Sequence, residues 1–214
     1  MSQAEAHQVN TRQFLWEHAR IPPRFEQIDW TQLSAVPPRT LASVRAFCAS
    51  FPIKGGRNGL YLWSPTPGTG KTALAITAIR ETIRLGKVRR LASFFTMQDI
   101  IEICRQTFPE QTLLEDHPIG SRLFESELLV IDDVGKGRLT EWASSEYFRV
   151  INRLYNECRP VIFTSNLPPS GLIKALNTAQ KFDQPDELFG HTVVSRIVEM
   201  CEEIRLNGAD YRLG

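Results

Sequence analysis

The sequence lacks a paired-cysteine motif and any strong excess of charge. Its four cysteines, at 48, 104, 158 and 201, lie far apart and form no C-x-x-C pair. This spacing argues against a zinc site and a disulfide framework, and it is typical of reduced cysteines that pack in the interior. The formal net charge is +1, so no global electrostatic field attracts nucleic acid, although a local basic surface can still exist.

Signals for secretion and for membrane insertion are also missing. The first residues include Glu5, His7 and Arg12 but no apolar segment of the kind found in secretory signals. No stretch reaches the roughly 18–20 apolar residues that a membrane-spanning helix needs. We therefore expect a cytoplasmic protein without a membrane partner. Its 214 residues are enough for one substantial domain.

A phosphate-binding loop is the clearest motif that is present. Residues 64–72 read SPTPGTGKT, between an apolar run at 59–63 that predicts a strand and helical apolar spacing at 73–83. A glycine-rich turn at a helix N-terminus presents backbone N–H groups to a phosphate, and the helix dipole favours its negative charge. The residues expected to bind the phosphates of ATP or ADP are Pro67, Gly68, Thr69, Gly70, Lys71, Thr72 and Ala73.

Two side chains of this loop have specific expected roles, and one residue departs from the usual pattern. Lys71 would reach the β- and γ-phosphates, and the Thr72 hydroxyl would hold Mg²⁺. Pro65 stands where the motif usually has its first glycine, with a fixed φ and no N–H. This departure affects the shape of the loop and the rate of hydrolysis more than phosphate contact, so the rate stays open.

A second apolar run, beginning at Glu127, ends in the adjacent carboxylates Asp132 and Asp133. Apolar residues without alternation indicate a strand buried on both faces, as in a parallel sheet. From this position Asp132 can hold Mg²⁺ through water, and Asp133 can orient and deprotonate the attacking water. Two neighbouring carboxylates beside buried residues are costly unless a cation or a basic group offsets them.

Asn166 and Arg196 are further candidates for the same chemistry. Asn166 ends a buried strand and can contact the γ-phosphate or the water, because an amide both donates and accepts. Arg196 lies on a predicted helix, and its guanidinium can stabilise charge on the γ-phosphate, also from a neighbouring subunit. The simpler interpretations are a turn cap for Asn166 and a solvated helix arginine for Arg196.

The order of the expected elements indicates the fold class. Strands are expected at 59–63, 89–95, 127–133, 160–166 and 203–206. Helices are expected at 11–19, 38–51, 73–83, 96–108, 119–126, 140–158, 170–176 and 192–200, with Thr96 and Thr140 as caps and loops at 109–118 and 177–189. This alternation predicts an α/β doubly wound parallel sheet. Ligands of such sheets bind at the carboxyl ends of the strands, where the phosphate loop, Asp132, Asp133 and Asn166 all fall.

Together these motifs resemble the AAA+ ATPases of the DnaC/DnaI helicase-loader family and the related IstB transposition helpers. The resemblance rests on GLYLWSPTPGTGKTALA, LLVIDDVGKGRLTEWASSEYFRVINRLYNECRPVIFTSN and VVSRIVEMCEEIRLNGADYR, and it covers about 21–212. It implies a P-loop AAA+ ATPase domain at 21–214, with a parallel sheet sandwiched by helices and little or no C-terminal lid. A short N-terminal arm at 1–20 would precede it.

The resemblance also implies roles for single segments. The stretch Gly68 to Thr72 resembles Walker A, and Asp132-Asp133 resembles Walker B, with Asp133 as the base. Asn166 is similar to the sensor 1 residue, and Arg196 resembles the arginine finger that acts in trans when the protein self-associates. By the same resemblance, Ile21 to Phe25 lies near the adenine, and residues 96–126 form the helical insertion of initiators and loaders.

Three functions stay open from the sequence. The resemblance implies an ATP-dependent replicative helicase loader that binds single-stranded DNA and a hexameric helicase during replication initiation. An IstB-type transposition helper that works with a transposase on double-stranded DNA fits the same motifs. A slow-hydrolysing, nucleotide-gated adaptor fits if Pro65 leaves ATP binding intact and slows hydrolysis.

Residues for contact with DNA are only weakly indicated. The basic candidates near strand ends or in the insertion are Arg89, Arg90, Arg105, Arg122, Lys136 and Arg138. Each is also interpretable as solvated surface charge. Phe94 and Phe95 could offer a stacking face, although packing in the core is the simpler interpretation.

Overall fold

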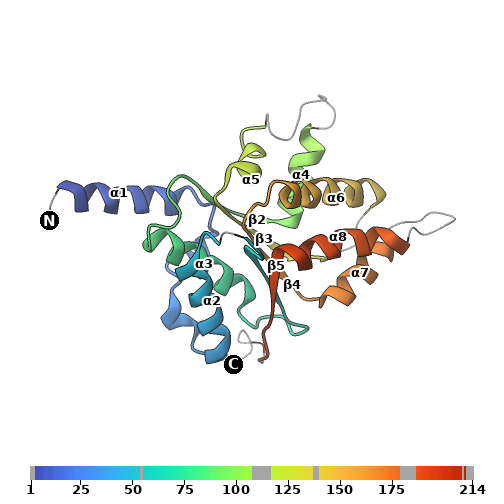
Figure 1. Ribbon diagram of the computed structural model, residues 1–214, viewed down its shortest axis with the longest axis horizontal. Coiled ribbons are helices and arrows are strands. Elements are labelled where there is room, and N and C mark those ends of the chain that lie inside the picture. The colour runs from blue at the N-terminus through green and yellow to red at the C-terminus, as the bar shows by residue number, and fades with distance from the viewer. Residues whose placement is uncertain are drawn as a thin grey trace.

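The computed structural model describes residues 3–53, 55–107, 117–136, 140–178, 187–208 and 210. Its centre is a five-stranded sheet in the order β2-β3-β4-β1-β5, with every pairing parallel (Figure 1). The strands are β1 Gly59–Trp63, β2 Ala92–Thr96, β3 Leu128–Val134, β4 Val161–Ser165 and β5 Cys201–Arg205. This confirms the predicted α/β fold with a parallel sheet.

Helices cover both faces of the sheet. They are α1 Gln3–Glu17, α2 Pro38–Ser50, α3 Lys71–Arg84, α4 Met97–Thr107, α5 Ser121–Glu125, α6 Glu141–Asn156, α7 Pro169–Thr178 and α8 Glu187–Met200, with short 3-10 helices at Pro23–Phe25 and Trp30–Leu33. Residues of α1, α2 and α3 form one buried apolar cluster, and residues of α4 to α8 form the other. None of the helices in the described ranges is both long and apolar enough to span a membrane.

The strands contribute to both clusters because successive side chains of a strand point to opposite faces. In β3, Leu129 and Ile131 belong to the α4 to α8 cluster, whereas Leu128 and Val130 belong to the other. All four side chains have 0% exposure. The unbroken apolar run at the start of β3 is thus explained by burial on two faces.

Phe94 and Phe95 follow the same alternation. Their exposed fractions are 4% and 0%, and each belongs to a different cluster. This confirms that they pack in the core, so a stacking face for nucleic acid at these positions is wrong. Cys48, Cys104 and Cys201 are likewise buried, and burial raises the pKa of the Cys48 thiol to about 12.

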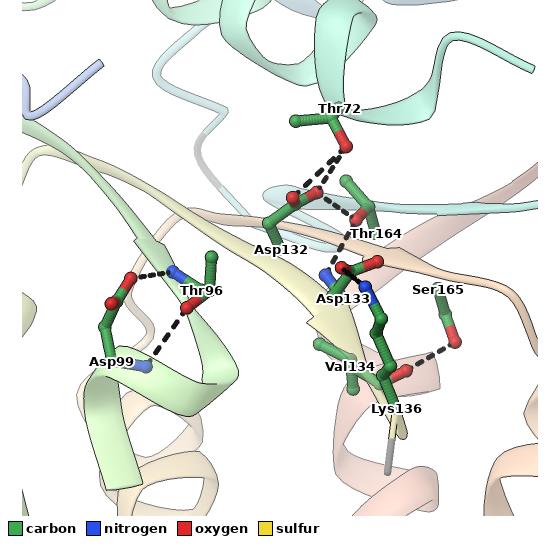
Figure 2. Close-up of polar contacts among 9 residues, drawn as sticks. All are labelled: Thr72, Thr96, Asp99, Asp132, Asp133, Val134, Lys136, Thr164 and Ser165. Atoms are coloured by element: carbon green, nitrogen blue, oxygen red, sulfur yellow. Dashed lines mark hydrogen bonds and ion pairs between the residues drawn. The ribbon is translucent and has the colours of Figure 1, made fainter. Parts of the chain in front are cut away.

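Two predicted helix caps are confirmed. Thr96 and Asp99 bond reciprocally at the start of α4: the Thr96 N–H donates to Asp99 Oδ2 at 2.7 Å, and the Asp99 N–H donates to Thr96 Oγ1 at 3.0 Å (Figure 2). Thr140 caps α6 by accepting from the Ala143 N–H at 3.2 Å. Both caps fix a helix start directly beside the carboxyl end of the sheet.

Several element boundaries differ from the prediction. The strand expected at 89–95 begins only at Ala92, because the backbone N–H groups of Arg89 and Arg90 donate to the Glu127 carboxylate at 2.6 and 3.1 Å instead of to a strand. The last strand begins at Cys201, directly after α8, and α8 itself begins at Glu187 instead of 192. The loops expected at 109–118 and 177–189 lie largely outside the described residues.

The N-terminal segment joins the sheet edge. The helix expected at 11–19 extends from Gln3 to Glu17, and its first turns project from the body in Figure 1. Leu15 and Ala19 are buried, and the Ala19 carbonyl accepts from the N–H of Phe94 in β2 at 2.8 Å. The division into an arm at 1–20 and a domain at 21–214 stays a prediction.

We predict that Gly59→Ala destabilises the protein by about 1–3 kcal/mol, because β1 lies between two strands and leaves no room for a methyl group. A Cβ at Gly59 would collide with the Val161 carbonyl oxygen and lie 2.8 Å from Cys201 Sγ. Thermal unfolding should show a larger loss than Gly86→Ala, where the space is open and only the positive φ of 66° opposes a side chain. A smaller loss for Gly59→Ala would contradict this packing.

Candidate nucleotide-binding site

A cavity of about 700 Å³ lies where the carboxyl ends of β1, β3 and β4 meet the start of α3. The predicted residues that line it are Pro67, Gly68, Thr69, Gly70, Lys71, Thr72, Ala73, Asp132, Asp133 and Asn166. Arg24 and Phe25 of the stretch expected near the adenine line it as well. The structure therefore brings these sequence-predicted residues together, while their roles stay predictions.

The loop geometry suits a phosphate. Gly68 and Gly70 have φ values of 69° and 86°, which strain residues with a side chain, and Gly70 directly precedes α3. The N-cap residue is Gly70, which has no side chain to cap the helix, and the first residues of α3 line the cavity. Lys71 is 6% exposed, and its Nζ donates to the Thr66 carbonyl oxygen at 3.3 Å. A phosphate bound in the loop would place negative charge near this buried ammonium.

Pro65 belongs to the phosphate loop and Asp210 lies beside it, but neither is among the described residues that line the cavity. Pro65 is exposed, and the loop still begins as an extension of the sheet, because the Ser64 N–H donates to the Ser165 carbonyl oxygen at 3.2 Å. A Cβ at Gly68 would collide with the carboxylate of Asp210, so the chain beyond β5 returns to the phosphate loop. Sequence reasoning missed this contact, because no local pattern relates residues so far apart.

Asp132 connects three segments of the site. The Thr72 hydroxyl donates to its two carboxylate oxygens at 2.9 and 3.1 Å, and the Thr164 hydroxyl donates to Oδ1 (Figure 2). The residue is only 5% exposed, and burial raises the pKa of its carboxyl above the ordinary value, although both hydroxyls oppose the rise. An adjacent hydroxyl and carboxylate are hard oxygen donors, and a cation would offset this buried charge, so the pair fits Mg²⁺.

Asp133 reaches the same cavity only because β3 is irregular. Adjacent residues of a regular strand point to opposite faces, yet both carboxylates line this cavity. The β3–β4 register shifts between Ile131 and Val134, and Asp133 has a φ of 59°. The Thr164 hydroxyl accepts from its displaced N–H at 3.0 Å. This bulge turns the second carboxylate toward the cavity.

Thr164 is a site residue that the sequence analysis missed. It accepts from the Asp133 N–H and donates to Asp132, so it stabilises both the bulge and the buried carboxylate. A threonine near the end of an apolar strand indicated a polar contact at this edge of the sheet. The partners of its hydroxyl could not be predicted, because they depend on β4 lying next to β3. Lys136, which the sequence analysis considered only for contact with DNA, also belongs to the site, since its Nζ donates to Asp133 Oδ2 at 2.6 Å.

Arg196 is not among the described residues that line the cavity. Its guanidinium donates to the Thr192 carbonyl oxygen at 2.8 Å and lies 5.3 and 5.6 Å from the ring centroids of Phe148 and Tyr155. These contacts hold the half-buried side chain of Arg196 between α8 and α6. Arg196 therefore does not act on the site of its own chain in this conformation, and its action in trans stays a prediction.

Several basic residues considered for DNA contact have acidic partners. Arg90 pairs with Glu127 at 3.2 Å, Arg105 with Glu102 at 2.7 Å and Lys136 with Asp133. Arg138 lies outside the described residues. These pairs reduce the local positive charge without preventing contact with phosphates, because exposed ion pairs are weak.

Comparisons with known proteins found a matching family and two similar curated proteins. The sequence model of the family described as IstB-like ATP binding protein matches residues 4–214. The phage-like element PBSX protein XkdC of Bacillus subtilis (strain 168) is 29% identical over 154 residues, covering 69% of this chain and 50% of that protein. An insertion sequence IS21-like putative ATP-binding protein of Bacteroides fragilis is 27% identical over 146 residues, covering 68% and 50%. The chain thus spans about half the length of these curated relatives.

Among solved structures, the DnaC helicase loader is similar along its whole length. The match has a TM-score of 0.67 and 26% identity, and it covers 87% of this chain and 100% of that chain.

We predict that Asp132→Asn stabilises the ligand-free protein at neutral pH by about 1 kcal/mol, or roughly 2–4 °C in Tm, because it removes a buried charge. The raised pKa of Asp132 means that the folded state holds this proton more tightly than the unfolded chain. The ionised carboxylate therefore opposes folding above the folded pKa, and this cost disappears as the pH falls below the unfolded pKa.

Thermal melts from neutral to acidic pH check this prediction. The difference in Tm between Asp132→Asn and the wild type should shrink as the pH falls, and stabilisation by Mg²⁺-ATP should be largely lost in the variant. A variant less stable than the wild type at neutral pH would mean that the hydrogen bonds from Thr72 and Thr164 outweigh the cost of burial.

Proposed function

The chain belongs to the family of IstB-like ATP binding proteins, and we propose that it is an ATP-hydrolysing loader that assembles a hexameric replicative helicase on single-stranded DNA. The observation that carries this proposal is the match to the DnaC helicase loader over the whole of that chain. The arrangement of Lys71, Thr72, Asp132 and Asp133 around one cavity supports hydrolysis by the same site.

In this proposal the phosphate loop binds the triphosphate. The N–H groups at the start of α3 donate to phosphate oxygens, and the Lys71 ammonium offsets their charge. Thr72 and Asp132 would hold Mg²⁺, which supplies neutralisation of charge on the β- and γ-phosphates when it is bound. Thr164 keeps the Asp132 carboxylate oriented through its hydroxyl.

In this proposal Asp133 and Asn166 activate the attacking water. Asp133 lines the cavity, where its carboxylate can orient a water and accept its proton. Asn166 directly follows β4 and lines the same cavity, so its amide can orient the water or the γ-phosphate. Arg196 of a second copy would stabilise the charge that develops during transfer.

An IstB-type transposition helper is the second candidate function. The specific observation in its favour is the relative from an insertion sequence, whose printed description is an ATP-binding protein. In this case the partner would be a transposase and the DNA would be double-stranded. The nucleotide chemistry would be the same, so only the partner distinguishes the two functions.

Capture of the partner from the native host, in the presence of ATP, tests the proposal. We expect the tagged chain to retrieve a replicative helicase, identified by mass spectrometry, and Lys71→Ala to lose this capture because it weakens phosphate binding. Retrieval of a transposase instead would support the helper. Calorimetry and turnover measured together test whether the chain is instead a slow-hydrolysing, nucleotide-gated adaptor. Tight ATP binding without hydrolysis, with or without DNA, would contradict an ATP-hydrolysing loader.

We predict that Arg196→Ala lowers kcat by about 10³-fold or more without weakening ATP binding, because an arginine finger acts on the transition state. Mixing it with Asp133→Asn should restore part of the activity, since each chain of the mixture supplies what the other lacks. Arg149→Ala, which removes an arginine from an exposed ion pair with Glu146 on α6, is the matched control. Activity that is lost and is not restored on mixing would contradict action in trans.

A further inference from the structure

Lys136 lies between the nucleotide cavity and a second cavity of about 370 Å³. Of the described residues that line the two cavities, Lys136 is the one that they share. Its ammonium contacts Asp133 Oδ2 at 2.6 Å, on the carboxylate proposed to activate water (Figure 2). A single side chain thus connects the proposed base to a separate surface.

The turn after β3 places Lys136 between the two cavities. The Lys136 N–H donates to the Asp133 carbonyl oxygen at 3.2 Å, and Gly135 between them has a φ of 81°. A Cβ at Gly135 would lie 2.6 Å from Leu172 Cδ1, so packing as well as conformation keeps this position a glycine. Because Thr164 holds the backbone of Asp133 at the other end, both partners of the ion pair start from constrained backbone.

The ion pair opposes the role proposed for Asp133. A carboxylate oxygen that accepts from an ammonium is less available to a water aimed at the γ-phosphate. The side chains of Lys136 and Asp133 are 58% and 31% exposed, so the pair is weak enough to be exchanged for another anion. An anion bound in the second cavity would compete with Asp133 for the ammonium.

The second cavity has the chemistry of a site for a nucleotide unit. Lys136 and Arg105 supply cationic donors, and Met97 and Ile101 supply an apolar wall. Glu102 also lines the cavity, and its carboxylate pairs with Arg105 at 2.7 Å. Tyr147 also lines it; the side chain is 0% exposed, and its hydroxyl has no hydrogen-bond partner among the described residues. Basic groups beside an apolar wall suit a phosphodiester with its attached sugar or base, and the volume exceeds what a phosphate alone requires.

We propose that Lys136 is a brake on hydrolysis which a phosphodiester of single-stranded DNA releases from the second cavity. The DNA draws the ammonium away from Asp133 and leaves the carboxylate free for water. This inference rests on the proposed function, because it takes Asp133 as the base and DNA as a ligand. It makes Lys136 a positioning residue, one that acts through Asp133.

Steady-state ATP turnover of the full chain, with and without an oligothymidylate strand, tests the brake. Lys136→Ala should raise the DNA-free kcat roughly two- to fivefold, the factor that an exposed ion pair is worth. The KM for ATP should not change, and stimulation by the strand should largely disappear. Lys136→Arg keeps a cation at this position and should restore both the low DNA-free rate and the stimulation.

Two further variants and one further ligand separate the alternatives. Lys87→Ala removes an exposed lysine that lines neither cavity and should behave as the wild type. Arg105→Ala should weaken binding of the strand in fluorescence anisotropy and shift stimulation to higher DNA concentrations. Inorganic phosphate replaces the strand in a parallel series, and stimulation by phosphate alone would overturn the assignment to DNA.

A fall in the DNA-free kcat of Lys136→Ala, or full stimulation of this variant by the strand, would overturn the brake. Calorimetry with ATP distinguishes this failure from failure of the proposed function. If the wild type binds and hydrolyses ATP while the Lys136 variants behave like it, only the brake fails. If the wild type binds no ATP, the proposed function fails, and the brake fails with it.

Discussion

The candidate site depends on the hydrogen bonds to the buried carboxylate of Asp132. Hydroxyls from the start of α3 and from β4 donate to it, so one side chain connects the phosphate loop, β3 and the neighbouring strand. Each hydrogen bond to a charged group is worth about 1.5–3 kcal/mol, which partly offsets the cost of removing the carboxylate from water. These hydrogen bonds within the chain therefore hold the loop, the carboxylates and the end of β4 in one arrangement.

The bulge at the end of β3 is the second constraint. A regular strand would send Asp133 to the face opposite Asp132, away from the cavity. The left-handed backbone of Asp133 costs free energy, of order 1–3 kcal/mol for such a residue, and the bond from its N–H to Thr164 compensates part of this cost. The turn through Gly135 to Lys136 begins at the same irregularity. The bulge therefore positions both Asp133, the proposed base, and its cationic partner Lys136.

Much of the fold and many of the candidate residues were predictable, because their signals are local. A strand, a glycine-rich turn and a helix in succession predict where Lys71 and Thr72 lie, and parallel strands must end at one edge of a sheet. The boundaries of β2 and β5 were less accurate. The Glu127 carboxylate replaces strand pairing for Arg89 and Arg90, and β5 follows α8 without an intervening loop. Neither feature could be predicted from the residues close by in sequence.

By itself, the sequence determined the class of the fold, the phosphate loop and the presence of two carboxylates beside it, since each depends on residues that are neighbours in the chain. Only the tertiary structure decided which residues surround those carboxylates. Thr164 and Lys136 acquire their contacts from strand order and from a bulge, and Arg196 lies against Phe148 and Tyr155 instead of in its own cavity. The contacts of Thr164 and Arg196 join segments far apart in the chain, and the Lys136–Asp133 contact, although local, depends on the bulge at the end of β3. The energy of packing selects them, and no local pattern encodes it.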